Sequence, residues 1–151
     1  MIYLIDGYNL IGAWHHVQLR DSEKERKLAS FLRQSLRARD SAVLYFDGRR
    51  LLDTLGERES CGAISIVYTP AGISADEAIQ RAMTSYQQKK SVQIVSSDRE
   101  IQKTAKSLRL VCVGSDTFMK MLYASFHAGE GDVKPEEMSS LEFGYWESCF
   151  R

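Results

Sequence analysis

The chain has 151 residues, of which 44% are hydrophobic and 26% charged, with only two Pro and ten Gly. This length fits one domain, the composition excludes a disordered or fibrous chain, and no apolar run approaches the roughly 20 residues that span a bilayer, so we expect a cytoplasmic protein. The 20 basic and 20 acidic residues cancel, so the total charge excludes a strongly basic nucleic-acid binder.

Five short runs of apolar and β-branched residues predict strands, and segments with helical periodicity separate them. The strands are expected at residues 2–5, 42–46, 63–68, 92–95 and 110–113. The runs are apolar without alternation, which is typical of a parallel sheet whose two faces are covered by helices. Alternation of strand and helix predicts a doubly wound α/β fold.

Amphipathic helices are predicted between the strands. Apolar residues recur at helical spacing over residues 28–36, 79–86 and 101–108, a further helix is expected over about 116–126, and a shorter one over 51–57. Three Ser-x-x-Glu capping boxes predict helix starts. They pair Ser22 with Glu25, Ser74 with Glu77 and Ser97 with Glu100.

The C-terminal part of the chain differs in composition from the rest. Residues 127–137 combine Gly, Pro and charge and predict a linker, and the residues beyond it hold an apolar helical stripe. We therefore expect a body at 1–128 and, at 129–151, a linker and helical tail that docks on the body. The tail holds six acids and two bases, which leaves 18 bases against 14 acids in the body. A mildly basic body is compatible with a polyanion such as RNA.

The cysteines indicate neither a disulfide framework nor a thiolate zinc site. Cys61, Cys112 and Cys149 are an odd number, widely spaced, with no CxxC pair. We expect reduced thiols.

Acidic residues follow three of the five predicted strands. Asp6, Asp47 and Asp98 stand at or just after the strand ends, and Asp76 and Glu77 lie in the first turn of the helix before the fourth strand. In open α/β sheets the carboxyl ends of the strands carry the chemistry. Clustered carboxylates repel one another unless a cation neutralises them, and all-oxygen ligands suit Mg²⁺ or Mn²⁺.

Each of these acids also has a purely structural interpretation. Asp76 and Asp98 can be favourable first-turn charges, Glu77 the return arm of a capping box, and Asp47 a turn residue. Asp6 is harder to explain in this way, because no predicted helix start follows it directly. The coincidence of these acids at one sheet edge favours a functional cluster.

Several polar and aromatic residues near the acids have two interpretations each. Asn9 can orient a carboxylate or a water, or serve in a turn, and Tyr8 can stack on a base or pack. Asp116 is either an extra acid or part of a helix cap. His15 and His16 are adjacent, so their side chains diverge and do not predict a metal pair.

Missing motifs exclude other classes. The sequence has no GxGxxG after the first strand, no GxxxxGK[ST] and no GxSxG, so we expect no dinucleotide cofactor, no P-loop and no nucleophile elbow. Residue 8 is Tyr rather than Asp, which argues against a DxD-type aspartyl-phosphate transferase.

Four segments resemble, in order and spacing, the signatures of NYN domains, specifically of the YacP-like branch of the PIN-like nuclease superfamily. They are DGYNLIG at 6–12, FDG at 46–48, SADE at 74–77 and SSD at 96–98, so the resemblance spans residues 1 to about 126. It implies a PIN-like parallel sheet of strand order 3-2-1-4-5 and a metal-dependent endoribonuclease. It also suggests ribosome-associated RNA as a target.

Carried over by position, the resemblance implies a set of site residues. Asp6, Asp76 and Asp98 would be ligands of Mg²⁺ or Mn²⁺, Asn9 would order the catalytic site, and Asp47 and Glu77 would be supporting ligands. We expect RNA to enter single-stranded, with Tyr8 or Trp14 stacking on a base and Arg49 or Arg50 contacting the backbone.

Two other functions compete with this one. The chain can be a non-catalytic module that binds RNA or the ribosome, or a metal-dependent phosphatase or nucleotidase on a similar sheet. Clustered carboxylates repel phosphate and have no evident use in a pure binder, which favours an enzyme.

Overall fold

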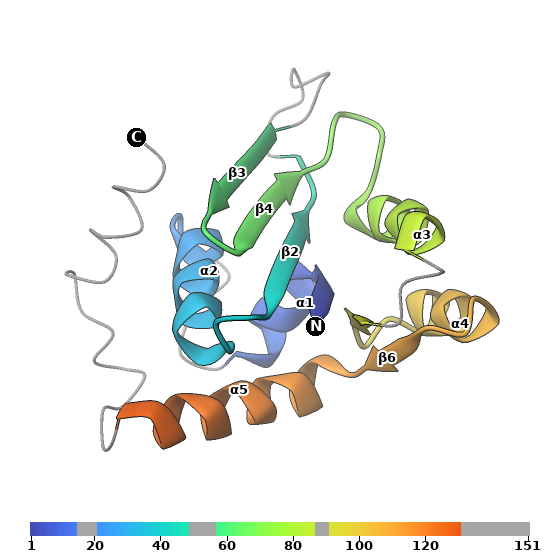
Figure 1. The fold of residues 1–151 in the computed structure, drawn as a ribbon. Coiled ribbons are helices and arrows are strands. Elements are labelled where there is room, and N and C mark those ends of the chain that lie inside the picture. The colour runs from blue at the N-terminus through green and yellow to red at the C-terminus, as the bar shows by residue number, and fades with distance from the viewer. Residues whose placement is uncertain (15–20, 49–56, 87–90, 131–151) are drawn as a thin grey trace.

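The computed structural model describes residues 1–14, 21–48, 57–86 and 91–130, and within them six strands form one sheet (Figure 1). The strand order is β3-β4-β2-β1-β5-β6. The strands are β1 (Ile2–Asp6), β2 (Ser41–Phe46), β3 (Glu57–Cys61), β4 (Ile64–Tyr68), β5 (Val92–Val95) and β6 (Val111–Val113). All neighbours pair in parallel except β3 and β4.

The five parallel strands are those expected, and β4-β2-β1-β5-β6 is the predicted 3-2-1-4-5 order. The antiparallel strand β3 was not predicted. Glu57 lies in β3 rather than at the end of a short helix, and residues 51–56 are outside the described part. A two-residue turn at 62–63 joins β3 to β4, and Gly62 adopts a φ of 58°, which tight hairpins require and glycine supplies without strain.

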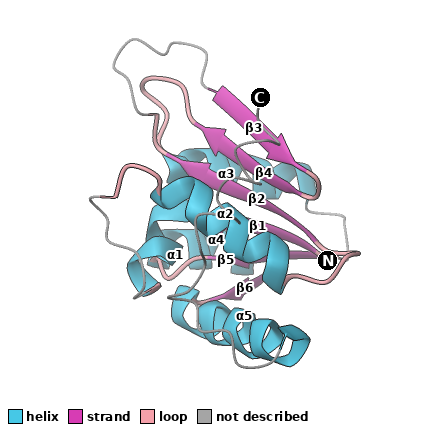
Figure 2. Cartoon of the chain, turned by 90° about the vertical axis from the view of Figure 1, so that its left-hand side faces the viewer, coloured by secondary structure: helices cyan, strands magenta, loops and turns pink. Residues whose placement is uncertain are grey.

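Helices cover both faces of the sheet (Figures 1 and 2). On one face lie α1 (Gly7–Ala13), α2 (Lys24–Ser35) and α5 (Ser115–Glu130), and on the other lie α3 (Ala75–Tyr86) and α4 (Arg99–Ser107). Side chains of β1 alternate between the two cores, because Tyr3 and Ile5 pack with the first group and Leu4 with the second. No helix in the described residues is long and apolar enough to cross a membrane.

Helix starts were predicted correctly in one case of three. The Ser74 hydroxyl accepts a hydrogen bond from the Glu77 N–H at 3.1 Å, as the capping box predicted. Ser97 does not cap α4, because the next residue, Asp98, is the N-cap. The box at Ser22 is also wrong: α2 begins at Lys24, with no side-chain cap.

The helix α1 was not predicted, and it changes the interpretation of Asp6. Asp6 ends β1 and is the N-cap of α1, accepting a hydrogen bond from the Asn9 N–H. The turn from strand to helix is tight, and Gly7 makes it possible, because a Cβ at this position would overlap the ring of the fully buried Phe46.

We expect Gly7→Ala to lower the free energy of unfolding by about 1 to 3 kcal/mol, because the added methyl group must displace a packed aromatic ring. Gly12 on the same helix is the matched control. A Cβ there meets nothing within 4 Å, so Gly12→Ala should stabilise the protein by up to about 1 kcal/mol through helix propensity. Urea denaturation of both variants checks this, and equal stability of the two would contradict it.

The helix α5 runs to Glu130, so residues 127–130 continue a helix rather than begin a linker. The rest of the predicted tail, residues 131–151, is outside the described residues, and its docking stays a prediction. Truncation after Gly131 should lower the melting temperature and the solubility more than the activity per folded molecule, because each large apolar side chain that docks contributes about 1.5 to 3 kcal/mol. Thermal melting of both chains tests this; an unchanged melting temperature would argue against docking.

Candidate active site

Asp6 lies at the carboxyl end of the central strand β1 and is only 7% exposed. Its Oδ1 accepts from the Asn9 N–H and its Oδ2 from the Ser96 hydroxyl, both at 3.5 Å. Burial opposes the charged form, and the carboxylates of Asp76 and, more weakly, Asp98 add repulsion, so the pKa of Asp6 rises to about 6. A buried carboxyl with this pKa is unusual outside functional sites.

Asp76 is the second acid of the cluster, from the first turn of α3 on the other side of the strand end. Its carboxyl group lies close enough to that of Asp6 for each to shift the pKa of the other. Burial raises the pKa of Asp76, and repulsion from Asp98 and, less strongly, Asp47 raises it further. The four carboxylates that the sequence pointed to therefore act on one another at a single sheet edge.

Asp98 joins the cluster from the loop after β5 and also caps α4. Its Oδ1 accepts from the N–H groups of Glu100 and Ile101 at 2.8 and 3.2 Å. Its own N–H donates to the Ser96 hydroxyl at 3.0 Å. The structural interpretation of Asp98 as a helix cap is correct, and its charge still faces Asp76.

Ser96 and Ser115 are residues of the site that sequence reasoning did not single out. Ser96 is fully buried, and its hydroxyl connects the side chain of Asp6 to the backbone of Asp98. Its place as the first residue of the SSD segment at 96–98 is the only signal that could have found it. Ser115, at the start of α5, is 2% exposed and donates its hydroxyl proton to Asn9.

Asn9 holds three elements together at the site. Its Oδ1 accepts from the Ser97 N–H at 2.8 Å and also from the Ser115 hydroxyl. One side chain of α1 thus fixes the loop that carries Asp98 and the start of α5. This arrangement suits the predicted ordering role.

Asp47 and Glu77 lie at the margin of the cluster. Asp47 follows β2, is exposed, and accepts from the Ala75 N–H at 2.7 Å, which positions the first turn of α3 and with it Asp76. Glu77 instead forms an ion pair with Arg81, one helical turn further on, at 2.6 Å.

We expect Glu77→Gln to retain at least about a third of any metal-dependent activity. Gln serves at this position of a capping box, and the Glu77 carboxylate is already paired with Arg81. Titration of activity against Mn²⁺ for both proteins is the measurement. A loss of orders of magnitude that high Mn²⁺ restores would make Glu77 a metal ligand after all.

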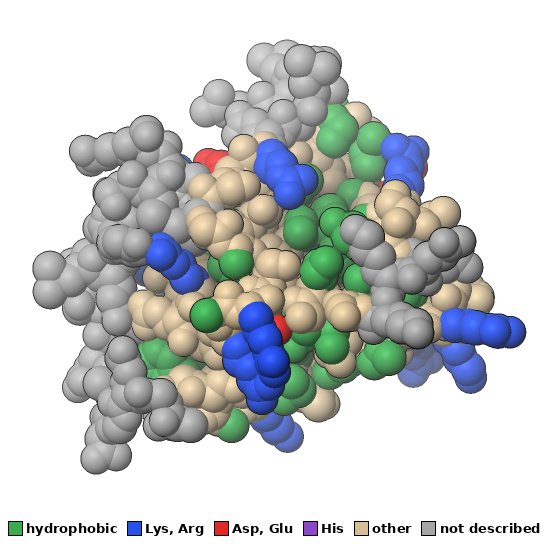
Figure 3. Space-filling view, in the orientation of Figure 1, with side chains coloured by type: hydrophobic (Ala, Val, Ile, Leu, Met, Phe, Trp, Pro, Cys, Tyr) green, Lys and Arg blue, Asp and Glu red, His purple; other side chains and the backbone are tan. Residues whose placement is uncertain are grey.

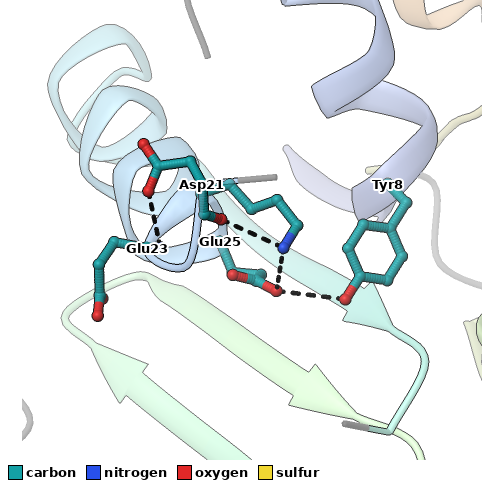
Figure 4. Close-up of polar contacts among 5 residues, drawn as sticks. Tyr8, Asp21, Glu23 and Glu25 are labelled. Carbon is teal, nitrogen blue, oxygen red and sulfur yellow. Dashed lines mark hydrogen bonds and ion pairs between the residues drawn. The ribbon is translucent and has the colours of Figure 1, made fainter. Parts of the chain in front are cut away.

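Tyr8 packs rather than standing free (Figure 4). Its hydroxyl donates to the fully buried Glu25 at 3.2 Å, its ring meets Phe46 edge-on at 4.8 Å between centroids, and Lys24 lies 5.7 Å from the ring centroid. Lys24 also forms an ion pair with Glu25 at 3.4 Å. These contacts cover part of the Tyr8 side chain, so only the remaining part is available to contact an RNA base.

Trp14 was predicted to stack on RNA, and its position contradicts this. The indole is 3% exposed and stacks on Phe31 at 5.2 Å in the core below α1. Burial of this large apolar ring away from water stabilises the folded protein. Arg49 and Arg50 lie outside the described residues, so their backbone contacts stay predictions.

The three acids of the cluster offer the type of ligand atom that a hard divalent cation prefers. Asp6, Asp76 and Asp98 offer only carboxylate oxygens, and their mutual repulsion is what a bound cation would relieve. Among the described residues, no group of three His, Cys, Asp or Glu side chains is already oriented to hold one ion. The Asp6 carboxylate instead accepts from Asn9 and Ser96, and that of Asp98 accepts from the first turn of its helix.

A doubly wound parallel sheet with acids gathered at its carboxyl edge defines a PIN-like α/β domain. The model of the YacP-like NYN domain matches residues 3–140, and the chain belongs to this family of nuclease-like domains. A search of the curated proteins found no match.

Solved structures share the fold. A crystal structure of a mutant of Rae1 (YacP) from Bacillus subtilis is 16% identical, with a TM-score of 0.63, and the match covers 98% of this chain and 99% of that one. A further crystal structure of Rae1 (YacP) is 18% identical, with a TM-score of 0.64 over 85% of this chain and 76% of that one. At these identities the likeness shows the fold alone.

Proposed function

We propose that this chain is a metal-dependent endoribonuclease that hydrolyses phosphodiester bonds of single-stranded RNA. The observation that carries the proposal is the convergence of Asp6, Asp76 and Asp98 at one sheet edge, where burial and, after it, repulsion from the other two acids raise the pKa of Asp6 to about 6. A module that only binds RNA gains nothing from carboxylates that oppose one another's ionisation and repel phosphate. Membership of a nuclease-like family supports the same conclusion.

Asp6, Asp76 and Asp98 would hold Mg²⁺ or Mn²⁺, with Asp47 and Glu77 as supporting carboxylates. When bound, such an ion supplies charge stabilisation at the phosphate and activation of a water for in-line attack. Without a cation the pKa of both Asp6 and Asp76 is raised, and a bound cation would favour the ionised form of both carboxyl groups.

Neighbouring residues keep the acids in place. The Ser96 hydroxyl donates to the Asp6 carboxylate and accepts from the Asp98 N–H, so it links the two acids. Asn9 fixes the loop carrying Asp98 against α1 and α5. Positioning of this kind is what a site needs to hold a phosphate in line with a water.

Basic and aromatic residues near the acids are the proposed contacts to RNA. On the face shown in Figure 3, the visible Lys and Arg side chains stand in separate groups, with hydrophobic and uncharged surface between them. We propose Arg49 and Arg50 as contacts to the phosphates and the exposed part of Tyr8 as a contact to a base.

Two substrates and two metal conditions test the proposal. A long RNA and a chromogenic phosphomonoester are each incubated with the protein in Mn²⁺ or EDTA. We expect internal cuts in the RNA with 5′-phosphate and 3′-hydroxyl ends in Mn²⁺, none in EDTA, and no hydrolysis of the monoester. Hydrolysis of the monoester would indicate a phosphatase, and RNA binding without cleavage in any metal would indicate a non-catalytic module.

Ribosome-associated RNA is the target that we propose on the family resemblance alone. Sedimentation of an Asp98→Asn protein with purified ribosomes tests this. Absence from the ribosomal pellet at low salt would contradict it without affecting the nuclease assignment.

A further inference from the structure

An open hollow of about 350 Å³ lies directly beside the candidate active site. Tyr8, Asn9 and Gly12 of α1 form one side of it, and Ser97, Ser115 and Asp116 form the other. Asn9 donates its N–H to Asp6, and Ser97 immediately precedes Asp98. A nucleotide whose phosphate reaches the acids can therefore place a neighbouring group in this hollow.

The charge of the hollow selects the kind of group that enters it. Its only ionisable carboxylate among the lining residues is that of Asp116, which is exposed and has no hydrogen bond or ion pair to the described residues. A carboxylate repels phosphate and accepts from neutral N–H or O–H donors. The volume is at the small end for ligand sites, which suits a base or nucleoside.

We propose that this hollow binds a guanine base next to the scissile phosphate, and that Asp116 selects guanine; the proposal rests on the proposed function. Guanine is the RNA base with two adjacent N–H donors, at N1 and N2, and a carboxylate accepts both. An internal ribose offers only its 2′-hydroxyl. The Watson–Crick edge is accessible because the RNA is single-stranded.

Gly12 keeps the hollow open. A Cβ on Gly12 meets nothing within 4 Å, so a larger side chain can grow from α1 into the hollow without moving the backbone. Gly12→Phe should fill the hollow and Gly12→Ala should narrow it slightly. A graded loss of binding with side-chain size is therefore expected.

The first test uses nucleosides, which carry no phosphate and so do not report on the acid cluster. Guanosine, inosine and adenosine are titrated into the ¹⁵N-labelled protein in EDTA, and amide shifts are followed by NMR. We expect guanosine to shift the amides of Gly12, Ser97 and Asp116 with an affinity about 5- to 100-fold above that of inosine, which lacks the N2 amino group. Equal affinities, or shifts that map elsewhere, would overturn the proposal.

Substitutions make the test specific to the carboxylate. Asp116→Asn should remove the preference for guanosine over inosine, and Gly12→Phe should abolish binding of both. Glu100→Gln is the matched control, because Glu100 is likewise an exposed first-turn acid, on α4, and does not line the hollow. Melting temperatures verify that each variant is folded. A preference that survives Asp116→Asn would overturn the role of Asp116.

Cleavage of a random-sequence RNA pool in Mn²⁺ separates this proposal from the proposed function. The wild-type protein should cut with guanine enriched at one fixed position beside the cleavage site, and Asp116→Asn should cut without that enrichment. Cleavage by the wild-type protein with no base preference would overturn the guanine pocket and leave the nuclease in place. If no RNA is cut in any metal, the proposed function fails, and the nucleoside titration still decides whether the hollow binds guanine.

Discussion

Asp6→Asn and Asp98→Asn should each lower RNA cleavage by at least about a thousandfold while the protein stays folded. Each change removes one carboxylate from the cluster in which the pKa of Asp6 and of Asp76 is raised. A cation that activates water and phosphate is worth several kcal/mol, and each 1.36 kcal/mol is tenfold in rate. Single-turnover cleavage of a labelled RNA in Mn²⁺ measures the effect.

The control for this pair of variants is again Glu100→Gln. Glu100 is two residues from Asp98, but its side chain is 77% exposed and pairs with Lys103 at 3.6 Å. Its loss should leave the cleavage rate within about twofold, because an exposed ion pair contributes little. Full activity in both Asp variants would refute the assignment of the acids.

The second large effect is on stability, and it depends on pH. In the metal-free protein the pKa of Asp6 is about 6, against an ordinary value of 3.8, so the folded state holds the Asp6 proton more tightly than the unfolded state. The free energy of unfolding therefore falls as pH rises between about 4 and 6, and the Asp6 contribution to this loss reaches about 3 kcal/mol at pH 7.5, since one pKa unit is 1.36 kcal/mol. The Asp6→Asn protein has no titrating carboxyl group at this position, so its free energy of unfolding does not fall with pH for this reason.

Urea denaturation from pH 4 to 7.5 in EDTA compares the two proteins. Asp6→Asn should become more stable than the wild-type protein by a margin that grows with pH. Added Mn²⁺ should raise the stability of the wild-type protein at pH 7.5 more than that of Asp6→Asn, because a bound cation favours the ionised carboxylates. A margin that is constant across pH would show that Asp6 is not coupled to folding.

The five parallel strands could be predicted from the sequence because a buried parallel strand is a local apolar run, whereas their order was implied by the family resemblance. The same reasoning placed Asp6, Asp47 and Asp98 at one edge, since every parallel strand ends on that side. The helix α1 was not predicted because it has only seven residues and starts immediately at the strand end. It also includes Gly7 and Gly12, which oppose helix formation.

Tertiary contacts account for most of what sequence reasoning missed at the site. Asn9 bonds to Ser97 and Ser115, which are 88 and 106 residues away, and no local pattern carries that information. The same holds for Trp14, an aromatic residue that a pattern cannot distinguish as packed or exposed. Ser97 was predicted to cap α4, but Asp98 takes that position. The Ser97 hydroxyl instead accepts a hydrogen bond from the Ser115 N–H.

The unpredicted strand β3 forms one border of the sheet, and on its outer side it has no strand partner in the described part of the chain. Unpaired backbone groups at such a border invite another molecule to extend the sheet. Arg58 on this strand is exposed, and Glu59 forms an ion pair with Arg26 of α2 at 3.5 Å. Charged side chains on an edge strand oppose its pairing with a second sheet, so we expect Arg58 and Glu59 to disfavour association of two molecules along β3.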